Sequence, residues 1–235
     1  MRVQDQPIYI LHHRAYQDTS QILEIFSRDY GRLAVMSRGS RGPKSKLKAF
    51  LQPFNSLLVS WSGKGELPLL TKAEQSDQKA VRLAGKALPS AFYINELLMR
   101  LLHRHDVNEE IFDLYRDVLL GLENTENLET DLRVFEKKLL QILGFGLNLV
   151  MDIDANEQVQ ESLSYAYYIE HGPVLVSDLN FDPKQLVIKG KTLLAFENNN
   201  LSDAEMRKEI KSLMRYVLSY YLGDKPLKSR ELFRR

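Results

Sequence analysis

The sequence predicts an α+β protein with an N-terminal OB-type β-barrel, a central α-helical bundle and a small mixed C-terminal part. Three observations support this order. Residues 1–80 hold five short β-type runs separated by turn residues. Residues 81–148 carry apolar side chains at helical spacing, and residues 149–235 combine a hairpin pattern with one long amphipathic segment.

The five β-type runs fall in the first third of the chain. They lie at residues 7–12, 20–26, 31–37, 55–61 and 67–74. Turn signals such as Ser62-Gly63-Lys64-Gly65 separate them. Five short, regularly spaced strands are typical of a small barrel, and the OB-type barrel has that number of strands.

The helical and mixed segments follow. We expect helices at 91–103, 111–120 and 132–143, with Ser90 as a candidate N-cap of the first helix and Gly144 as the C-cap glycine of the third. Residues 165–169 and 172–176 predict a hairpin, and residues 185–194 fit either a strand or a helix. A long helix is expected at 203–222, capped by Ser202 or Asp203 and ending at Gly223. We expect this last helix to pack on the central helical domain.

Composition narrows the class of protein. Of 235 residues, 44% are hydrophobic and 27% are charged, as in ordinary globular proteins. No apolar run reaches the length of a membrane span, and the N-terminus lacks the apolar core of a signal peptide. We therefore expect a soluble, cytoplasmic, bacterial protein without membrane contact. The absence of cysteine excludes disulfides, cysteine–zinc sites and thiol nucleophiles.

Charge is segregated along the chain, although the net charge is only +1. Residues 30–65 contain no acid. In residues 106–131 every charged residue except Arg116 is an acid, and in residues 207–235 most charged residues are basic. A single charge run is usually a solvated face, but an uninterrupted basic stretch favours phosphate contact. The candidate DNA-binding cations are those of residues 30–65: Arg32, Arg38, Arg41, Lys44, Lys46, Lys48 and Lys64.

Five of these cations lie in residues 38–48, which we call the basic loop. Gly39, Gly42 and Pro43 prevent a regular helix there. Long cations on such a loop suit single-stranded DNA, whose backbone has no fixed groove. Four aromatic residues are candidates to stack bases, and each stack contributes about 1–3 kcal/mol. They are Tyr16, Tyr30, Phe54 and Trp61. For Phe54 and Trp61, which lie on strand-like runs, core packing is the commoner role.

Motifs of catalysis are missing. The sequence contains no phosphate-binding loop, dinucleotide fingerprint, HExxH or GxSxG motif, and its histidines lack metal-ligand spacing. We therefore expect a binding protein that is not an enzyme and needs no cofactor. Two alternatives stay open: an OB-fold interaction adaptor without direct DNA binding, docking through acidic residues 106–131, and a metal-dependent nuclease using Asp152, Asp154 and Glu157.

Seven short stretches, in order and at the expected spacing, resemble the RecO family of bacterial DNA repair and recombination mediators. They are Tyr16-Gln-Asp-Thr-Ser20, Phe26 with Gly31-Arg32, Val35-Met-Ser-Arg-Gly-Ser-Arg41, Leu51-Gln-Pro-Phe54, Tyr93-Ile-Asn-Glu-Leu97, Arg133-Val-Phe-Glu136 with Leu143-Gly-Phe-Gly146, and Gly223-Asp-Lys-Pro-Leu-Lys-Ser-Arg230. The resemblance spans nearly the whole chain. It implies an N-terminal OB-fold, a central helical bundle and a C-terminal part that often carries a four-cysteine zinc site.

The resemblance also implies an activity and partners. Members bind single- and double-stranded DNA, anneal complementary strands and, with RecR, help load RecA onto DNA coated by single-strand-binding protein, which places them on the bacterial nucleoid. They bind the acidic, phenylalanine-ended tail of that coating protein, and Arg133 matches the position that supplies the cation, with Phe135 and Lys137 beside it. This chain has no cysteine after Gly146, so we expect no zinc there, with packing by Tyr165, Tyr167, Val174 and Val176 in its place.

Overall fold

The computed structural model describes residues 2–77, 81–124, 126–177 and 185–234. Contacts group the chain into two compact units: Met1–Thr125 together with Pro226–Arg235, and Glu126–Lys225. The three-segment division expected from the sequence stays a prediction, because grouping by contacts does not test which segments fold independently. In the described ranges no helix is long and apolar enough to cross a membrane.

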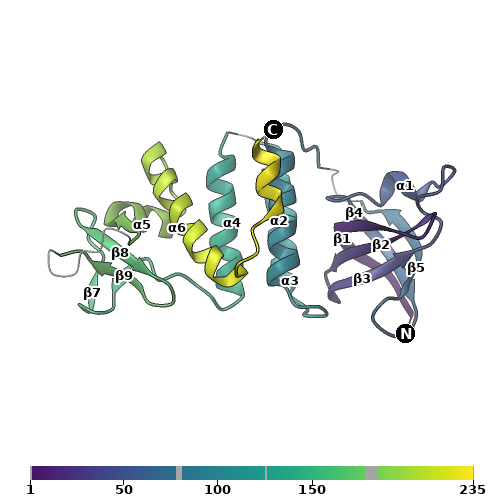
Figure 1. The fold of residues 1–235 in the computed structure, drawn as a ribbon, viewed down its shortest axis with the longest axis horizontal. Coiled ribbons are helices and arrows are strands. Elements are labelled where there is room, and N and C mark those ends of the chain that lie inside the picture. Colours follow the sequence, from purple (N-terminus) through teal and green to yellow (C-terminus); the bar gives the residue numbers. More distant parts are fainter. Residues whose placement is uncertain (1, 78–80, 125, 178–184, 235) are drawn as a thin grey trace. The chain divides into compact units, whose positions relative to one another are not determined.

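The first unit contains the predicted barrel. Its strands are β1 (Arg2–Tyr16), β2 (Ser20–Ser27), β3 (Gly31–Ser37), β4 (Ser56–Ser62) and β5 (Leu69–Gln75). They close in the order β1-β2-β3-β5-β4, with β3 and β5 parallel at Met36–Leu69 and the other neighbours antiparallel (Figure 1). A five-stranded closed barrel in this order confirms the OB-fold, and the α+β class with it.

Large apolar side chains fill the barrel. Leu23, Ile25, Val35, Leu57 and Trp61 are all almost fully buried in one cluster. They come from β2, β3 and β4, so the alternation of apolar residues along each strand points one face of the sheet inward. Trp61 is therefore part of the core, the commoner role for an aromatic residue on a strand.

The first unit also contains helices α1 (Leu47–Phe50), α2 (Ala87–Leu101) and α3 (Glu109–Gly121) and the 3-10 helix η1 (Lys228–Arg234). The expected N-cap role of Ser90 is wrong. Helix α2 begins earlier, because a proline at position 89 is tolerated in a first turn whose N–H groups need no intrahelical acceptor. Ser90 Oγ instead donates to the carbonyl of Lys86 at 2.9 Å.

A buried polar chain joins these helices to β1. Tyr115 Oη donates to Asn95 Oδ1 at 2.6 Å, and Asn95 Nδ2 donates to the carbonyl of Leu11 at 2.8 Å. Asn95 is buried, so both hydrogen bonds offset the cost of removing an amide from water. The neighbouring Glu96 accepts from the backbone N–H groups of Lys228 and Ser229 and from Ser229 Oγ, which ties η1 to α2.

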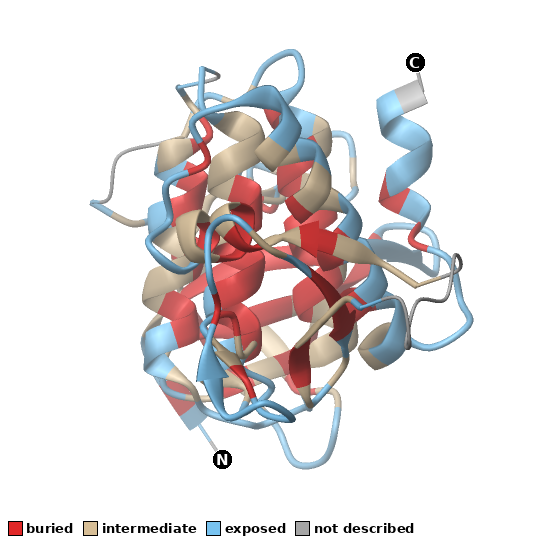
Figure 2. Ribbon diagram, turned by 90° about the vertical axis from the view of Figure 1, so that its left-hand side faces the viewer, coloured by how far each residue is buried: buried red, intermediate tan, exposed pale blue. Residues whose placement is uncertain are grey.

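The second unit packs helices and small sheets (Figure 2). Its elements are α4 (Leu128–Ile142), β6 (Met151–Asp152), β7 (Glu157–Gln158), β8 (Ser164–Tyr168), β9 (Gly172–Leu175), β10 (Val187–Lys189), α5 (Gly190–Glu197) and α6 (Ala204–Leu222). The sheet has the order β10-β8-β9, so the predicted β8–β9 hairpin is present. The ambiguous residues 185–194 divide into a strand and the start of a helix.

Helix ends in this unit follow capping chemistry. Asp203, not Ser202, caps α6, because its Oδ1 accepts from the N–H of Met206 at 2.8 Å. Gly144 has φ of +86° after α4, and the N–H groups of Gly144 and Phe145 donate to the carbonyls of Gln141 and Leu140. This is a Schellman arrangement, and it confirms the role predicted for that glycine.

The cysteine-free segment is held by packing and by one buried carboxylate. Tyr165 and Tyr167 are buried, and Val174 and Val176 are half-buried. Asp152 is also buried and accepts backbone N–H groups of residues 154, 155 and 175 at 2.7–3.1 Å. An Asp side chain that accepts from N–H groups two and three residues later is a known turn signal, but the contact of Asp152 with residue 175 depends on β9, which returns later in the chain.

Candidate nucleic-acid interface

The basic loop is tied at its base to the β1–β2 turn. The backbone N–H of Arg41 donates to the carbonyl of Thr19 at 2.8 Å, and Arg41 Nη1 donates to the carbonyl of Gln17 at 3.2 Å. Ser40 Oγ donates to the carbonyl of Ser37. Gly39 has φ of +66°, a left-handed conformation that glycine adopts without strain. The loop therefore starts from a fixed point at one end of β1, β2 and β3.

The five loop cations face solvent. Arg38, Arg41, Lys44, Lys46 and Lys48 are exposed, and none forms an ion pair with a carboxylate in the described ranges. Their charge is therefore not neutralised by the protein itself. This is the condition under which lysine and arginine can neutralise phosphates and release counterions.

A hollow of about 360 Å³ lies at the base of the loop. His13 and Gln21 line it from β1 and β2, while Arg41, Lys48 and Gln52 line it from the loop and from the segment after α1. His13 Nδ1 and Gln21 Oε1 lie 3.3 Å apart. Cations and amides around one concave surface can contact both a phosphate and the edge of a base.

The end of β1 adds residues that the sequence did not single out. His12, His13 and Arg14 are exposed there, although they belong to the barrel's longest strand. The signal was a change in pattern, because the apolar run ends at Leu11 and a polar stretch follows within the same strand. Burial lowers the pKa of the His12 imidazole, and the neighbouring His13 lowers it further, which favours the neutral ring.

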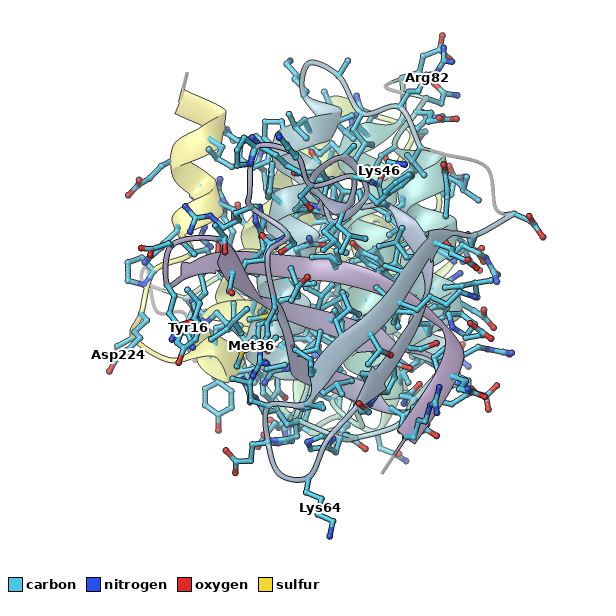
Figure 3. All side chains as sticks on the ribbon, turned by 90° about the vertical axis from the view of Figure 1, so that its right-hand side faces the viewer. Tyr16, Met36, Lys46, Lys64, Arg82 and Asp224 are labelled. Carbon is cyan, nitrogen blue, oxygen red and sulfur yellow. The ribbon has the colours of Figure 1, made fainter. Side chains whose placement is uncertain are left out.

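Lys64 is exposed but lies elsewhere on the barrel. It projects from the loop between β4 and β5, and Figure 3 shows it at the lower edge of the barrel, while Lys46 lies near the top of the same view. The structure therefore does not bring Lys64 together with the basic loop. A strand that contacts the loop would have to run across the barrel to reach Lys64.

Arg32 is engaged inside the first unit. Its Nη1 lies 3.3 Å from Glu24 Oε2 in an ion pair whose two side chains are largely buried, and its Nε donates to the carbonyl of Leu102 at 3.1 Å. Arg104 pairs with the other oxygen of Glu24 at 2.5 Å. Arg32 therefore holds the barrel to the segment after α2, and the proposed DNA contacts do not include it.

Three of the four candidate stacking residues pack within the protein. Trp61 is buried, Tyr30 meets its ring edge-on at 5.2 Å, and Phe54 meets Phe92 edge-on at 4.9 Å. Tyr16 is 39% exposed at the end of β1 (Figure 3). Of the four, Tyr16 alone offers a ring to solvent near the basic loop.

The candidate tail-binding residues lie inside the second unit. Phe135 is 1% exposed, and Arg133 Nη1 pairs with buried Glu136 Oε2 at 2.8 Å. Lys137 Nζ donates to the carbonyls of Phe196 and Glu197 at 2.6 and 2.8 Å, at the C-terminal end of α5. The Nε of Arg133 is buried and has no hydrogen-bond partner in the described part of the chain. Arg133 therefore retains an unused donor at Nε, whereas Lys137 already donates to two carbonyls.

Several acids of the two alternative functions have internal partners, whereas Glu157 is exposed on β7. Asp152 holds backbone N–H groups, and Asp154 pairs with His171 at 2.9 Å. Among the residues with described placement, no three His, Asp or Glu side chains form a metal-binding group. In the acidic stretch, the carboxylate of Glu109 pairs with Arg28 at 2.9 Å, and the carboxylate of Asp113 pairs with Arg116 at 2.7 Å.

Comparisons with known proteins cover nearly the whole chain. The family model described as Recombination protein O N terminal matches residues 1–78, and Recombination protein O C terminal matches residues 82–231. The chain is 43% identical to the DNA repair protein RecO of Dechloromonas aromatica, over 99% of this chain and 96% of that relative. It is 42% identical to the DNA repair protein RecO of Haemophilus influenzae, over 96% and 93% of the two chains.

Proposed function

This chain belongs to the RecO family of DNA repair and recombination proteins, and from that premise we propose that it is a mediator that binds DNA through the basic loop and anneals complementary strands. The observation that carries this proposal is the set of five exposed loop cations beside a hollow at one end of the OB barrel, which pair with no carboxylate among the residues of described placement. His13, Arg14 and Tyr16 on β1 extend the same surface.

Annealing by such a surface requires no catalytic group. Two strands repel each other through their phosphates, and cations that neutralise part of that charge lower the barrier to their approach. Base pairing then supplies the free energy. We therefore propose a function without enzymatic turnover and without a cofactor, acting on DNA in the bacterial cytoplasm.

We also propose that the acidic tail of single-strand-binding protein binds at Arg133. The buried guanidinium pairs with Glu136, so the carboxylate of a tail would have to compete for Arg133 or use its free Nε donor. Phe135 and Lys137 would support that position from within the unit. RecR, and through it RecA, are the further partners that the family relationship supports.

The experiment that tests this function is strand annealing. Complementary oligonucleotides coated with single-strand-binding protein are mixed with the chain, with and without RecR, and duplex formation is followed. We expect annealing by the wild type, and slower annealing after Arg38, Arg41, Lys44 and Lys46 are all replaced by alanine. Equal annealing by both proteins would remove the basic loop from the mechanism.

The tail site has a separate test. Arg133→Ala should reduce the affinity for a peptide with the tail sequence and leave binding to uncoated DNA unchanged, while Lys138→Ala, an exposed cation on the same helix, serves as the control. Unchanged peptide affinity of the folded Arg133→Ala protein would place the tail elsewhere.

A further inference from the structure

The second basic region of the sequence lies partly on α6, outside the surface described above. The apolar face of this helix holds Ile210, Leu213, Met214, Val217 and Leu218, all buried. It packs against α4 and α5, beside which it runs in Figure 1. The opposite face is therefore open to solvent along the helix.

That open face has a definite composition, and we call it the α6 stripe. Its members are exposed and recur at helical spacing: Lys208, Ser212, Arg215, Tyr216, Ser219 and Tyr220. At a rise of about 1.5 Å per residue the stripe is about 18 Å long. It combines two cations with two phenol rings and contains no acid and no aliphatic side chain.

The cations of the stripe are not neutralised by α6 itself. Lys208 and Arg215 have no ion pair with a carboxylate of known placement. The two acids of the helix, Glu205 and Glu209, both face Lys189, whose Nζ lies 2.6 Å and 4.0 Å from them. The exposed face therefore keeps a positive charge.

The rings of the stripe are presented to solvent and one is braced. Tyr216 is 41% exposed and Tyr220 is 58% exposed. The ring of Tyr220 rests edge-on against Tyr221 at 5.2 Å, and Tyr221 stacks on Phe145 at 4.4 Å. A ring restrained by a neighbouring ring loses less conformational entropy when it binds a base.

Two serines lie between the longer side chains of the stripe: Ser212 between Lys208 and Arg215, and Ser219 between Tyr216 and Tyr220. Ser212 Oγ donates to the carbonyl of Lys208 at 3.1 Å, and Ser219 Oγ donates to the carbonyl of Tyr216 at 2.7 Å. Their side chains are small and already hydrogen-bonded to the helix. A ligand can therefore lie close to the helix between the longer side chains.

We propose that the α6 stripe is a second binding surface for single-stranded DNA, with Lys208 and Arg215 contacting phosphates and Tyr216 and Tyr220 stacking bases. Cations next to open aromatic faces are the combination by which proteins bind single strands without sequence preference. Tyr216 and Tyr220 lie one turn apart, about 6 Å along the axis, so they can hold neighbouring bases.

This surface is distinct from the basic loop, because it lies on the other compact unit. Its existence does not rest on the proposed function, but its role in annealing does. A protein with two surfaces for single strands can hold two strands at once, which one surface alone cannot do.

Photo-crosslinking tests the surface directly. An oligodeoxythymidine containing 5-iododeoxyuridine is irradiated with the full-length chain, and crosslinked peptides are identified by mass spectrometry. We expect crosslinks at Tyr216 or Tyr220 in wild type and in the variant with the four alanines in the basic loop. Crosslinks confined to the first unit, with none on α6, would overturn the proposal.

Variants separate this proposal from the proposed function. Tyr216→Leu with Tyr220→Leu, or Lys208→Glu with Arg215→Glu, should weaken oligodeoxythymidine binding of the loop variant about tenfold or more. Lys138→Glu and Tyr168→Leu, exposed positions on α4 and β8, are the matched controls and should have no effect. If stripe variants bind and anneal as wild type while the loop variant fails, the stripe is overturned and the loop stands. If the loop variant is unaffected and the stripe variants fail, the loop is overturned and the stripe stands.

Discussion

The basic loop and the middle of α4, with Arg133 and Lys137, look alike in the sequence but differ in the folded chain. Each places arginine and lysine close to apolar residues. In the loop, Arg41 is exposed and its charge has no acidic partner among the described residues. On α4, Arg133 pairs with Glu136 and Lys137 caps α5, both within the packed unit. A cation in the sequence is therefore available to a ligand only where the fold leaves it without an internal partner.

The first way to test this contrast is to remove the packing that buries the α4 cations. Phe135→Ala should lower the free energy of unfolding by about 3–5 kcal/mol, because the ring is fully buried and its loss leaves a cavity. Urea denaturation measures this. Lys138→Ala, at an exposed position on the same helix, should change stability by less than about 0.5 kcal/mol. A small effect of Phe135→Ala on the free energy of unfolding would mean that the packing around the middle of α4 opens readily.

The second test concerns the ammonium of Lys137. Lys137→Met keeps an unbranched stem against Phe196 but removes the donor from two carbonyls at the end of α5. We expect a loss of about 1–3 kcal/mol in unfolding free energy, since buried acceptors are left unpaired. Burial lowers the pKa of this ammonium, and the hydrogen bonds to the two carbonyls favour its charged form. Unchanged stability with reduced tail-peptide binding would instead assign Lys137 to the partner.

A third test uses a carboxylate of intermediate exposure. Glu96 is partly buried, which raises its pKa, but hydrogen bonds from Ser229 and Lys228 outweigh this and leave the pKa below its ordinary value. The folded state therefore favours the ionised form of Glu96. The stability that the ionised carboxylate adds is fully present above the pKa of this carboxyl in the unfolded chain. It is lost as the pH falls through the pKa in the folded chain.

We therefore expect the free energy of unfolding of wild type to exceed that of Glu96→Gln by about 1 kcal/mol at neutral pH. The difference should shrink as the medium becomes acidic, because wild type then loses its carboxylate and the variant has none to lose. Thermal unfolding across the acid range measures this. A difference that does not change with pH would mean that the hydrogen bonds to η1, not the charge, carry the effect.

The sequence predicted local structure well where periodicity and caps decide it. The five strands, the hairpin, the long helix and Gly144 all follow from alternation, helical spacing or the need for positive φ. Ser90 was misassigned because a proline in the first turn does not mark the first residue of a helix.

Sites proved harder to predict than elements. Long-range contacts decide whether a charged residue is available to a ligand. Arg32 donates to the carbonyl of Leu102, and Lys137 donates to the carbonyls of Phe196 and Glu197, and no local pattern indicates either contact. The buried role of Asp152 depends on Leu175 across the unit, which no local motif indicates.

The availability of the loop cations is best tested by the salt dependence of DNA binding. Affinity for an oligodeoxythymidine is measured over a range of salt concentrations for wild type and for the variant with alanine at Arg38, Arg41, Lys44 and Lys46. If all four cations contact phosphates, the slope of log affinity against log salt should become shallower by about 3 units, roughly 0.7 for each contact. An unchanged slope in a folded variant would contradict the assignment of DNA binding to the basic loop.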